Sequence, residues 1–342
     1  MTIKKLTVIA AAGAVLLAGA LGISMSLTSP NEMEMEVPET PVAQGTENAD
    51  GSKTLADMEN IPLYYDETET LLLPLRNVME GLGGSVTWNK ETKMTEVTYR
   101  GKTLEVLPGE RAAELNGYAV TLPEAVKTIN GCLYADEKVI SAYYTGEVDF
   151  NMETRQVTLQ TKDHSTPVLA VREISGEKEG KAFTIEVPVI VGLNDSKYEA
   201  NLNDKIMEEM QAYADDFMAA EAAEGSNGLL QLELRTELCT KDFVSLWWEG
   251  TRDGSSVKLA KNFDLLGQKA VTLADMMTKE SLEKVKMAAG EGWTEDRFCL
   301  TSEGGLVLLK GSNENSQNMY YWTLEGEQPA WKDTYQRLFQ KK

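Results

Sequence analysis

The sequence predicts an α+β protein made of two small domains, each an antiparallel sheet packed on one or two helices. A unit of strand, helix, double glycine and strand that begins at Leu71 recurs in the same order from Leu133, so we expect the first domain to be built from an internal repeat. Other stretches alternate apolar and polar positions, as half-buried strands do. With 342 residues, of which 42% are hydrophobic, the chain can bury two cores.

The N-terminus predicts export. Lys4 and Lys5 precede a run of low polarity, LTVIAAAGAVLLAGALGI, from Leu6 to Ile23. We expect residues 1–27 to be either a cleavable signal peptide or a signal anchor that stays in the membrane. The lysines before the run and the acids after it orient the bulk of the chain outside the cytoplasm. The predicted location is the cell wall, after secretion, or the extracellular face of the cytoplasmic membrane.

The next segment, residues 28–60, is acidic and rich in Pro, Gly, Ser and Thr, and it has almost no aromatic residues. Such a composition cannot bury enough apolar surface to offset the entropy of folding. It predicts a disordered acidic linker that works as a solvated tether.

The first folded domain is predicted at residues 61–162. In the first copy of the repeat, a helix is expected to begin at Pro74 and to end at Gly83, with two strands after it. In the second copy, Asp136 is expected to cap the equivalent helix. Between the copies, Asn116-Gly117 predicts a tight hairpin turn.

The second folded domain is predicted at residues 167–342, again as α+β. Its strand FTIEVPVIVGL contains Pro188, which predicts an edge strand or a bulge. A long helix should follow, because apolar residues recur every three or four positions in a stripe typical of a core-facing helix. The residues of this stripe are Leu202, Ile206, Met210, Tyr213 and Phe217.

Composition excludes several functions. The net charge is −21, with 54 acids against 33 bases, so the surface repels phosphate backbones and no nucleic-acid partner is expected.

Cys132, Cys239 and Cys299 lie far apart, which leaves isolated thiols or one bridge, between Cys239 and Cys299. His164 is the sole histidine and falls between the domains, which argues against triads and imidazole metal sites. We therefore expect no cofactor and no enzyme, and paired carboxylates are the only acid–base chemistry left.

Trp247 and Trp248 are the candidate ligand contacts. Adjacent residues of a strand face opposite sides of the sheet, so one ring packs inside only if the other points outward. An uncovered outward ring can stack on a sugar or anchor a protein. If another segment covers it, both rings are core.

The first domain resembles a known module. LPLRNVMEGLGGSVTWNKET, the Asn-Gly hairpin and TGEVDFNMETRQVTL look like the copper amine oxidase N-terminal domain, a stalk-type module of secreted Gram-positive bacterial proteins. The second copy departs from the pattern with Ala135-Asp136-Glu137-Lys138 where Pro-Leu-Arg is usual. The module is similar to the stalk of the oxidase and not to its copper-bearing part, so the resemblance implies no copper site.

The second domain resembles the extracellular domain of the anti-sigma-V factor, which binds lysozyme in that family, and accessory modules found beside peptidoglycan deacetylase domains. The resemblance rests on Asn262-Phe263-Asp264 with Gly267 and on Leu273-Ala274-Asp275. The chain departs at Thr251–Ser256, where the family often has a Gly-Ala-His stretch. Only about five residues precede the apolar run, so we expect no cytoplasmic segment to hold a sigma factor.

These observations predict a non-catalytic exported protein of the cell envelope, in which the second domain binds a protein or glycan outside the cell. A lysozyme-like hydrolase and peptidoglycan are the candidate ligands, and the membrane is a partner if the N-terminal segment is not cleaved. Two alternatives remain open. A carboxylate-based wall hydrolase predicts a cleft with two acids, one of raised pKa. A purely structural spacer predicts no concave or apolar exposed patch.

Overall fold

The computed structural model describes residues 45–56, 58, 60–161, 166–221, 227–289, 293–301, 305–309, 319–322 and 330–338. The predicted export segment, the first part of the predicted linker and His164 lie outside these residues. Among the described helices, none is both long enough and apolar enough to cross a membrane.

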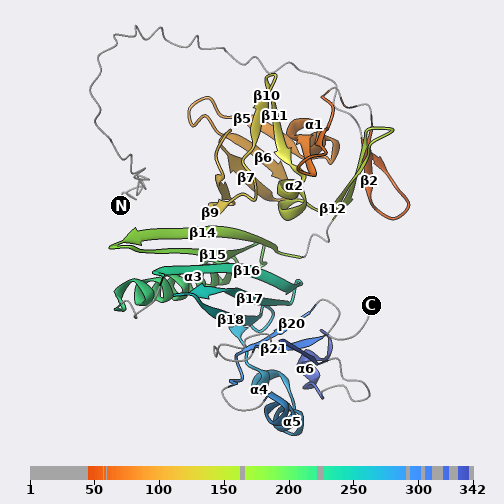
Figure 1. Ribbon diagram of the computed structural model, residues 1–342. Helices are drawn as coiled ribbons and strands as arrows, with labels where there is room; N and C mark the ends of the chain where they lie inside the picture. Colours follow the sequence, from red (N-terminus) through yellow and green to blue (C-terminus); the bar gives the residue numbers. More distant parts are fainter. Residues whose placement is uncertain are drawn as a thin grey trace, which may run out of the picture. The chain divides into compact units, whose positions relative to one another are not determined.

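The described strands of the first domain form three antiparallel sheets that pack with two short helices (Figure 1). The sheets have the strand orders β1-β2-β13-β12, β10-β11-β4-β3 and β5-β6-β7-β8-β9. The elements are β1 Thr46–Glu47, β2 Lys53–Leu55, β3 Leu63–Tyr65, β4 Thr70–Pro74, α1 Leu75–Gly81, β5 Ser85–Trp88, β6 Thr95–Tyr99, β7 Lys102–Val106, β8 Ala112–Leu115, β9 Tyr118–Thr121, β10 Lys127–Ile129, β11 Cys132–Asp136, α2 Glu137–Tyr143, β12 Thr145–Asn151 and β13 Gln156–Thr161.

The predicted repeat is present as β4-α1-β5-β6 and β11-α2-β12-β13. The strands that precede the two helices pair with each other, with Ala135 opposite Leu73. The strands that follow the helices belong to two different sheets. The copies therefore share one central strand pair, an arrangement that the repeat pattern did not predict.

The local signals of the repeat are confirmed. Pro74 is the N-cap residue of α1, where the missing N–H of proline costs nothing, and Gly83 ends the helix with a φ of 92°. In the second copy, Asp136 Oδ1 accepts a hydrogen bond from the Lys138 backbone N–H at 2.9 Å. Asn116 and Gly117 both have positive φ, as a two-residue hairpin turn requires.

The fold begins inside the predicted linker. Thr54 of β2 lies opposite Thr158 of β13, and Leu55 is 0% exposed in the first core. The linker therefore ends before residue 60. Composition missed these residues because it averages over a window, whereas one apolar side chain at the right register joins a core.

The second domain is built on a sheet whose described strands have the order β14-β15-β16-β17-β18-β19. Parallel pairing joins β15 to β16 through α3, with Ala182 opposite Leu229, and the other described pairs of this domain are antiparallel. The elements are β14 Val168–Lys178, β15 Lys181–Val191, α3 Ser196–Ala219, β16 Leu229–Cys239, β17 Phe243–Arg252, β18 Ser255–Asp264, β19 Lys269–Ala270, α4 Leu273–Met276, α5 Lys279–Ala289, β20 Phe298–Leu300, β21 Leu306–Leu309, β22 Met319–Trp322 and α6 Asp333–Gln336.

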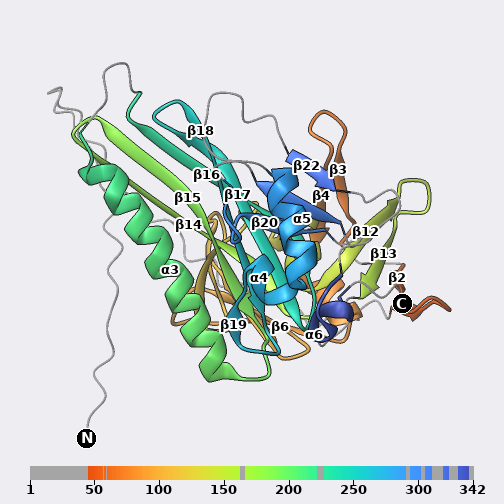
Figure 2. The ribbon, with the colours of Figure 1, turned by 90° about the horizontal axis from the view of Figure 1, so that it is seen from below.

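Two faces of this sheet are covered by different elements. Figure 2 shows α3 on one side of the strands and β20 with α5 on the other. The predicted stripe of α3 is core, since its residues pack against the inner face of the sheet. The opposite side holds a separate core of α4, α5, α6 and the β20–β21 hairpin.

Pro188 lies on β15, which is an interior strand of the sheet. The prediction of an edge strand is therefore wrong. It is opposite Val171 of β14, and the pairing of β15 with β16 ends earlier, at Ile185 opposite Leu232. The missing N–H of Pro188 therefore removes no hydrogen bond toward β16. Beyond that point a side chain of β15 makes the contact with β16: the Glu186 carboxylate accepts the Leu234 N–H at 2.8 Å.

Residues 40–342 cluster as one compact unit. The core of the first domain includes Val168 and Ala170 of β14. The Glu173 backbone N–H also donates to Thr121 Oγ1 at 3.0 Å. The core of the first domain therefore continues past Pro167, where the domain boundary was predicted.

Candidate functional site

The two candidate tryptophans point to opposite faces of β17, as the alternation of a strand requires, but both are buried. Trp248 is 0% exposed under α3, and its Nε1 donates to the Glu186 carbonyl at 2.6 Å. Trp247 is 5% exposed on the other face, and its Nε1 donates to Glu237 Oε1 at 3.1 Å. Neither ring is exposed for stacking, but Trp248 belongs to the lining of a groove on the α3 side of the sheet, so a ligand contact at Trp248 stays a prediction.

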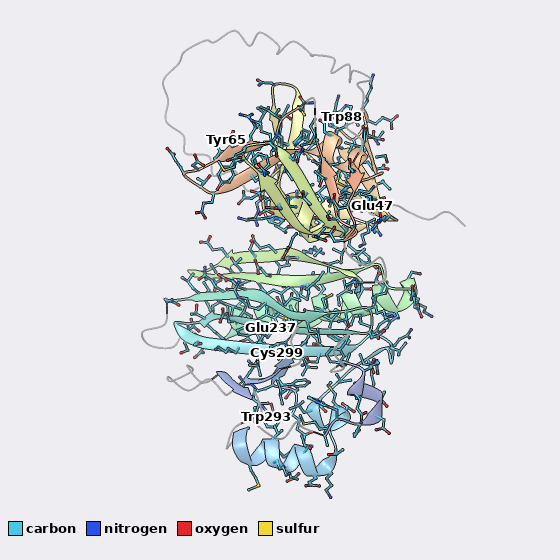
Figure 3. All side chains as sticks on the ribbon, turned by 90° about the vertical axis from the view of Figure 1, so that its right-hand side faces the viewer. Glu47, Tyr65, Trp88, Glu237, Trp293 and Cys299 are labelled. Atoms are coloured by element: carbon cyan, nitrogen blue, oxygen red, sulfur yellow. The ribbon has the colours of Figure 1, made fainter. Side chains whose placement is uncertain are left out.

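The cover over Trp247 comes from a segment far away in the sequence. Trp247 packs with Ala260, Cys299, Val307 and Leu309 in a small cluster between the sheet and the β20–β21 hairpin. Figure 3 labels Glu237 and Cys299 in this region. None of the three cysteines, all of which the structure describes, forms a disulfide, so of the two possibilities the isolated thiols are present and the bridge between Cys239 and Cys299 is not.

The residues that carry the second-domain resemblance hold the fold together. Asn262 is 2% exposed, and its Nδ2 donates to the Phe298 carbonyl at 2.7 Å while its Oδ1 accepts from Ser245 Oγ at 2.6 Å. Ser245 Oγ in turn accepts the Leu300 N–H at 2.8 Å. This pair therefore fixes β20 to the sheet.

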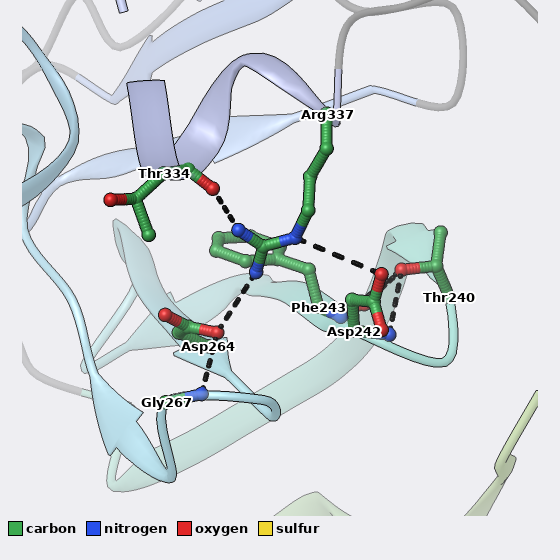
Figure 4. A network of polar contacts seen from close by, with 7 residues as sticks. All are labelled: Thr240, Asp242, Phe243, Asp264, Gly267, Thr334 and Arg337. Atoms are coloured by element: carbon green, nitrogen blue, oxygen red, sulfur yellow. Dashed lines mark hydrogen bonds and ion pairs between the residues drawn. The ribbon is translucent and has the colours of Figure 1, made fainter. Parts of the chain in front are cut away.

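Asp264 fixes the end of β18. Its Oδ1 accepts the Gly267 N–H at 2.9 Å and lies 3.2 Å from Nη2 of Arg337, which also forms an ion pair with Asp242 at 3.7 Å (Figure 4). A Cβ at Gly267 would lie 2.6 Å from Asp264 Oδ2, so the turn requires glycine. Just beyond this turn, Thr272 and Asp275 form a capping box that begins α4.

A groove runs between α3 and β18 on the α3 side of the sheet, and we call it the α3–β18 groove. It measures about 830 Å³, and its lining includes seven consecutive β18 residues, Ser255–Lys261, together with part of α3. Apolar side chains of both elements make its floor: Met210, Tyr213, Val257 and Leu259. The sequence favoured a core role for the helix stripe over a groove, whereas Met210 and Tyr213 of this stripe also line the groove.

The rim of the groove carries charges that are held by ion pairs across it. Arg252 Nη2 lies 2.8 Å from Asp216 Oδ2, and its guanidinium stacks 5.3 Å from the centre of the Tyr213 ring. Lys261 Nζ lies 2.7 Å from Glu209 Oε2. Each of these two basic side chains is thus held by an acid of α3.

The charge of the groove lining is opposite in sign to the net charge of the chain. Its lining contains four bases and two acids, whereas the chain has a net charge of −21. Besides the rim pairs, Arg297 and Asp296 lie at the edge of β18, where Arg297 Nη2 donates to the Lys258 carbonyl at 3.2 Å. The sequence offers no periodic signal for it, because the four bases come from β17, β18 and the segment just before β20.

A second, smaller hollow of about 570 Å³ lies in the first domain and is acidic, with Asp50, Glu137, Glu147 and Asp149 in its lining. Burial raises the pKa of Glu137, and the charge of Asp136 raises it further. The hydrogen bond from the Ser52 side chain lowers the pKa of Asp50. In the described part of the chain no group of His, Cys, Asp and Glu side chains is arranged to hold a metal ion.

Comparison with known proteins supports the assignment of the first domain. Residues 49–159 match the copper amine oxidase N-terminal domain. The match begins upstream of the predicted boundary at residue 61 and so includes β2, in agreement with the burial of Leu55. It covers less than half of the chain, and the resemblance is thereby confirmed for the first domain only.

For the second domain the comparisons are weaker. No curated protein matches the chain. A solved structure of a DUF3298 family member from Bacteroides fragilis is similar, with 15% sequence identity, a TM-score of 0.25, and coverage of 42% of this chain and 83% of that chain. A TM-score of this size establishes neither a common fold nor a function.

Proposed function

We propose that this chain is a non-catalytic exported protein of the cell envelope, and that its second domain binds a protein or glycan ligand outside the cell. Its location is the cell wall or the extracellular face of the cytoplasmic membrane. Two features support export: the apolar run that begins at Leu6 after two lysines, and a first domain that matches a module found as a stalk. Peptidoglycan and a lysozyme-like hydrolase are the candidate ligands.

The α3–β18 groove is the observation that carries the binding role. An apolar floor with a few convergent charged groups is typical of ligand sites. Its charged groups form two ion pairs, Arg252 with Asp216 and Lys261 with Glu209. This arrangement suits recognition of a charged ligand rather than proton transfer. A plain spacer needs no such groove, so its presence disfavours the spacer hypothesis.

Two binding assays with the full chain test this proposal. The first is sedimentation with insoluble peptidoglycan, and the second is calorimetric titration with a lysozyme at low and moderate salt. Saturable binding that survives moderate salt in either assay, and that Arg252→Gln weakens while Arg235→Gln does not, supports the proposal. Arg235 is the matched control, because it pairs with Glu249 away from the groove. Heat that disappears with salt in the lysozyme titration indicates only a basic protein meeting an acidic one. The absence of binding in both assays refutes the proposal.

The carboxylate-hydrolase alternative is favoured by one observation, the hollow in which the pKa of Glu137 is raised and that of Asp50 is lowered. Against it, the lining contains no aromatic residue to bind a sugar ring. Incubation of the full chain with purified peptidoglycan, followed by chromatography of released fragments, decides the question. Release of fragments that Glu137→Gln abolishes would establish the enzyme and overturn the non-catalytic proposal.

A further inference from the structure

We infer that the α3–β18 groove binds an extended acidic peptide, which adds beside the outer edge of β18. This inference rests on the proposed function, since it names the ligand class of the same groove. It draws on the shape of the groove, the backbone of the strand and the local charge.

The shape suits an extended chain. The groove lining follows β18 from Ser255 to Lys261, which at the rise of a β-strand corresponds to roughly 20 Å. One wall of this length is a strand and the other is the middle of α3, around Met210 and Tyr213. A long, shallow groove of this kind fits a peptide in β conformation, which lays alternate side chains on an apolar floor.

The backbone of β18 offers an outward N–H and C=O at Ser256, near the start of this stretch. Ser255 lies opposite Arg252 across a two-residue turn, so Ser255 and Val257 bond toward β17 and the residues between them face away from it. The Lys258 carbonyl, which accepts from Arg297, confirms the outward direction of the even-numbered residues. Among the described strands, pairing on this outer side begins only at Phe263, with β19. Ser256 can therefore give its N–H and C=O to an added strand.

The charge selects an acidic peptide. Four bases against two acids line the groove in a chain whose net charge is −21, so the field there attracts carboxylates that the rest of the surface repels. Asp216, which holds Arg252, has a side chain that is 72% exposed, so a ligand carboxylate can share that arginine at small cost. Lysines also protect strand edges from pairing, but this function does not explain the apolar floor of Val257 and Leu259.

Fluorescence anisotropy with the full chain tests the inference. The probe is a labelled acetyl-Glu-Val-Glu-Val-Glu-Val-Glu peptide at moderate salt, and the comparison peptide has glutamine at every glutamate. We expect saturable binding of the acidic peptide and at least about tenfold weaker binding of its glutamine form, since each charged hydrogen bond is worth about one factor of ten. A third peptide with proline at its centre, which cannot pair as a strand, should bind equally weakly.

Variants of the chain locate the site. Arg252→Gln and Lys261→Gln should each weaken the acidic peptide several-fold and together at least about tenfold, whereas Arg235→Gln on the other face should leave binding unchanged. Lys261 is 42% exposed, so its substitution is compatible with folding even if that of Arg252 is not. Equal affinity for the acidic and glutamine peptides, or binding that Lys261→Gln leaves intact, would overturn the inference. If the peptides fail to bind while peptidoglycan or lysozyme binds, this inference fails and the proposed function stands.

Discussion

Arg337 should be a main support of the C-terminal part of the second domain, and Arg337→Met tests this. Its guanidinium lies 3.2 Å from Asp264 and 3.7 Å from Asp242, and it also donates to the Thr334 carbonyl (Figure 4). Methionine keeps the length of the side chain but removes the charge. Asp264, with a side chain 4% exposed, would then lose its cationic partner and keep neutral donors such as the Gly267 N–H and the Tyr335 hydroxyl.

The expected decrease in the free energy of unfolding follows from the loss of these contacts. Breaking a fully buried ion pair costs about 3–5 kcal/mol, and leaving one buried acceptor short of a partner costs about 1–3 kcal/mol. The Arg337 side chain is 28% exposed, so water screens part of the interaction, and we expect about 2 kcal/mol. In urea unfolding followed by tryptophan fluorescence, this corresponds to a midpoint lower by roughly 1 M at an unchanged slope.

A double-mutant cycle shows whether the ion pair itself is responsible. Asp264→Asn keeps the acceptor for Gly267 but removes the charge, so Arg337→Met should cost about 1 kcal/mol less in that background. Arg235→Met, whose side chain is 47% exposed, is the control and should stay within about 0.5 kcal/mol of the unmodified chain. If Arg337→Met costs the same with Asp264 or Asn at that position, the reasoning is refuted.

Four other substitutions test the fold. Asn262→Ala should cost about 2–3 kcal/mol in urea unfolding, because it leaves buried partners in β17 and β20 unsatisfied; a cost near zero would show that it does not fix β20. Asp136→Ala should cost about 1 kcal/mol through the lost helix cap and Asp136→Ser much less, as measured by thermal unfolding; equal losses would contradict a capping role. Burial raises the pKa of the Cys299 thiol to about 12, so the folded chain holds this proton more tightly than the unfolded chain, and stability should fall as pH rises from about 9 toward 12; pH-dependent urea unfolding should show a shallower fall in Cys299→Ala, and an identical fall would argue against it. Leu55→Ala should cost about 2–5 kcal/mol in urea unfolding, while Ile61→Ala, 45% exposed, should change stability by less than about 0.5 kcal/mol; equal small effects would return this segment to the linker.

The sequence predicted the features that depend on a few neighbouring residues. The stripe of α3 follows from the spacing of its apolar residues, and the cap at Asp136 follows from one side chain and the helix after it. The hairpin at Asn116-Gly117 follows from two residues that tolerate positive φ. Each of these signals is contained in one continuous stretch of the chain, so it can be identified without knowing which distant segment packs against it.

The features that the sequence did not predict depend on pairings between distant segments. The strand pair β4–β11 and the pairing of β2 with β13 bring together residues that no periodicity connects. Trp247 shows the same limit, because the pattern of β17 placed the two tryptophans on opposite faces but gave no sign that the remote β20–β21 hairpin covers Trp247. Burial of a strand residue is set by whatever packs on the sheet, and that is decided elsewhere in the chain.

The same division separates the structural residues of the second domain from those of its groove. The recognisable residues Asn262, Asp264 and Gly267 cluster at the end of β18, where they fix the hairpin and the turn. The groove uses other positions of the same strand, from Ser255 to Lys261, which the recognisable pattern does not include. A chain can therefore keep every structural residue of the pattern while the groove residues, and with them the ligand, change independently. We therefore expect the basic residues of the groove, more than the structural residues Asn262, Asp264 and Gly267, to indicate the ligand of this protein.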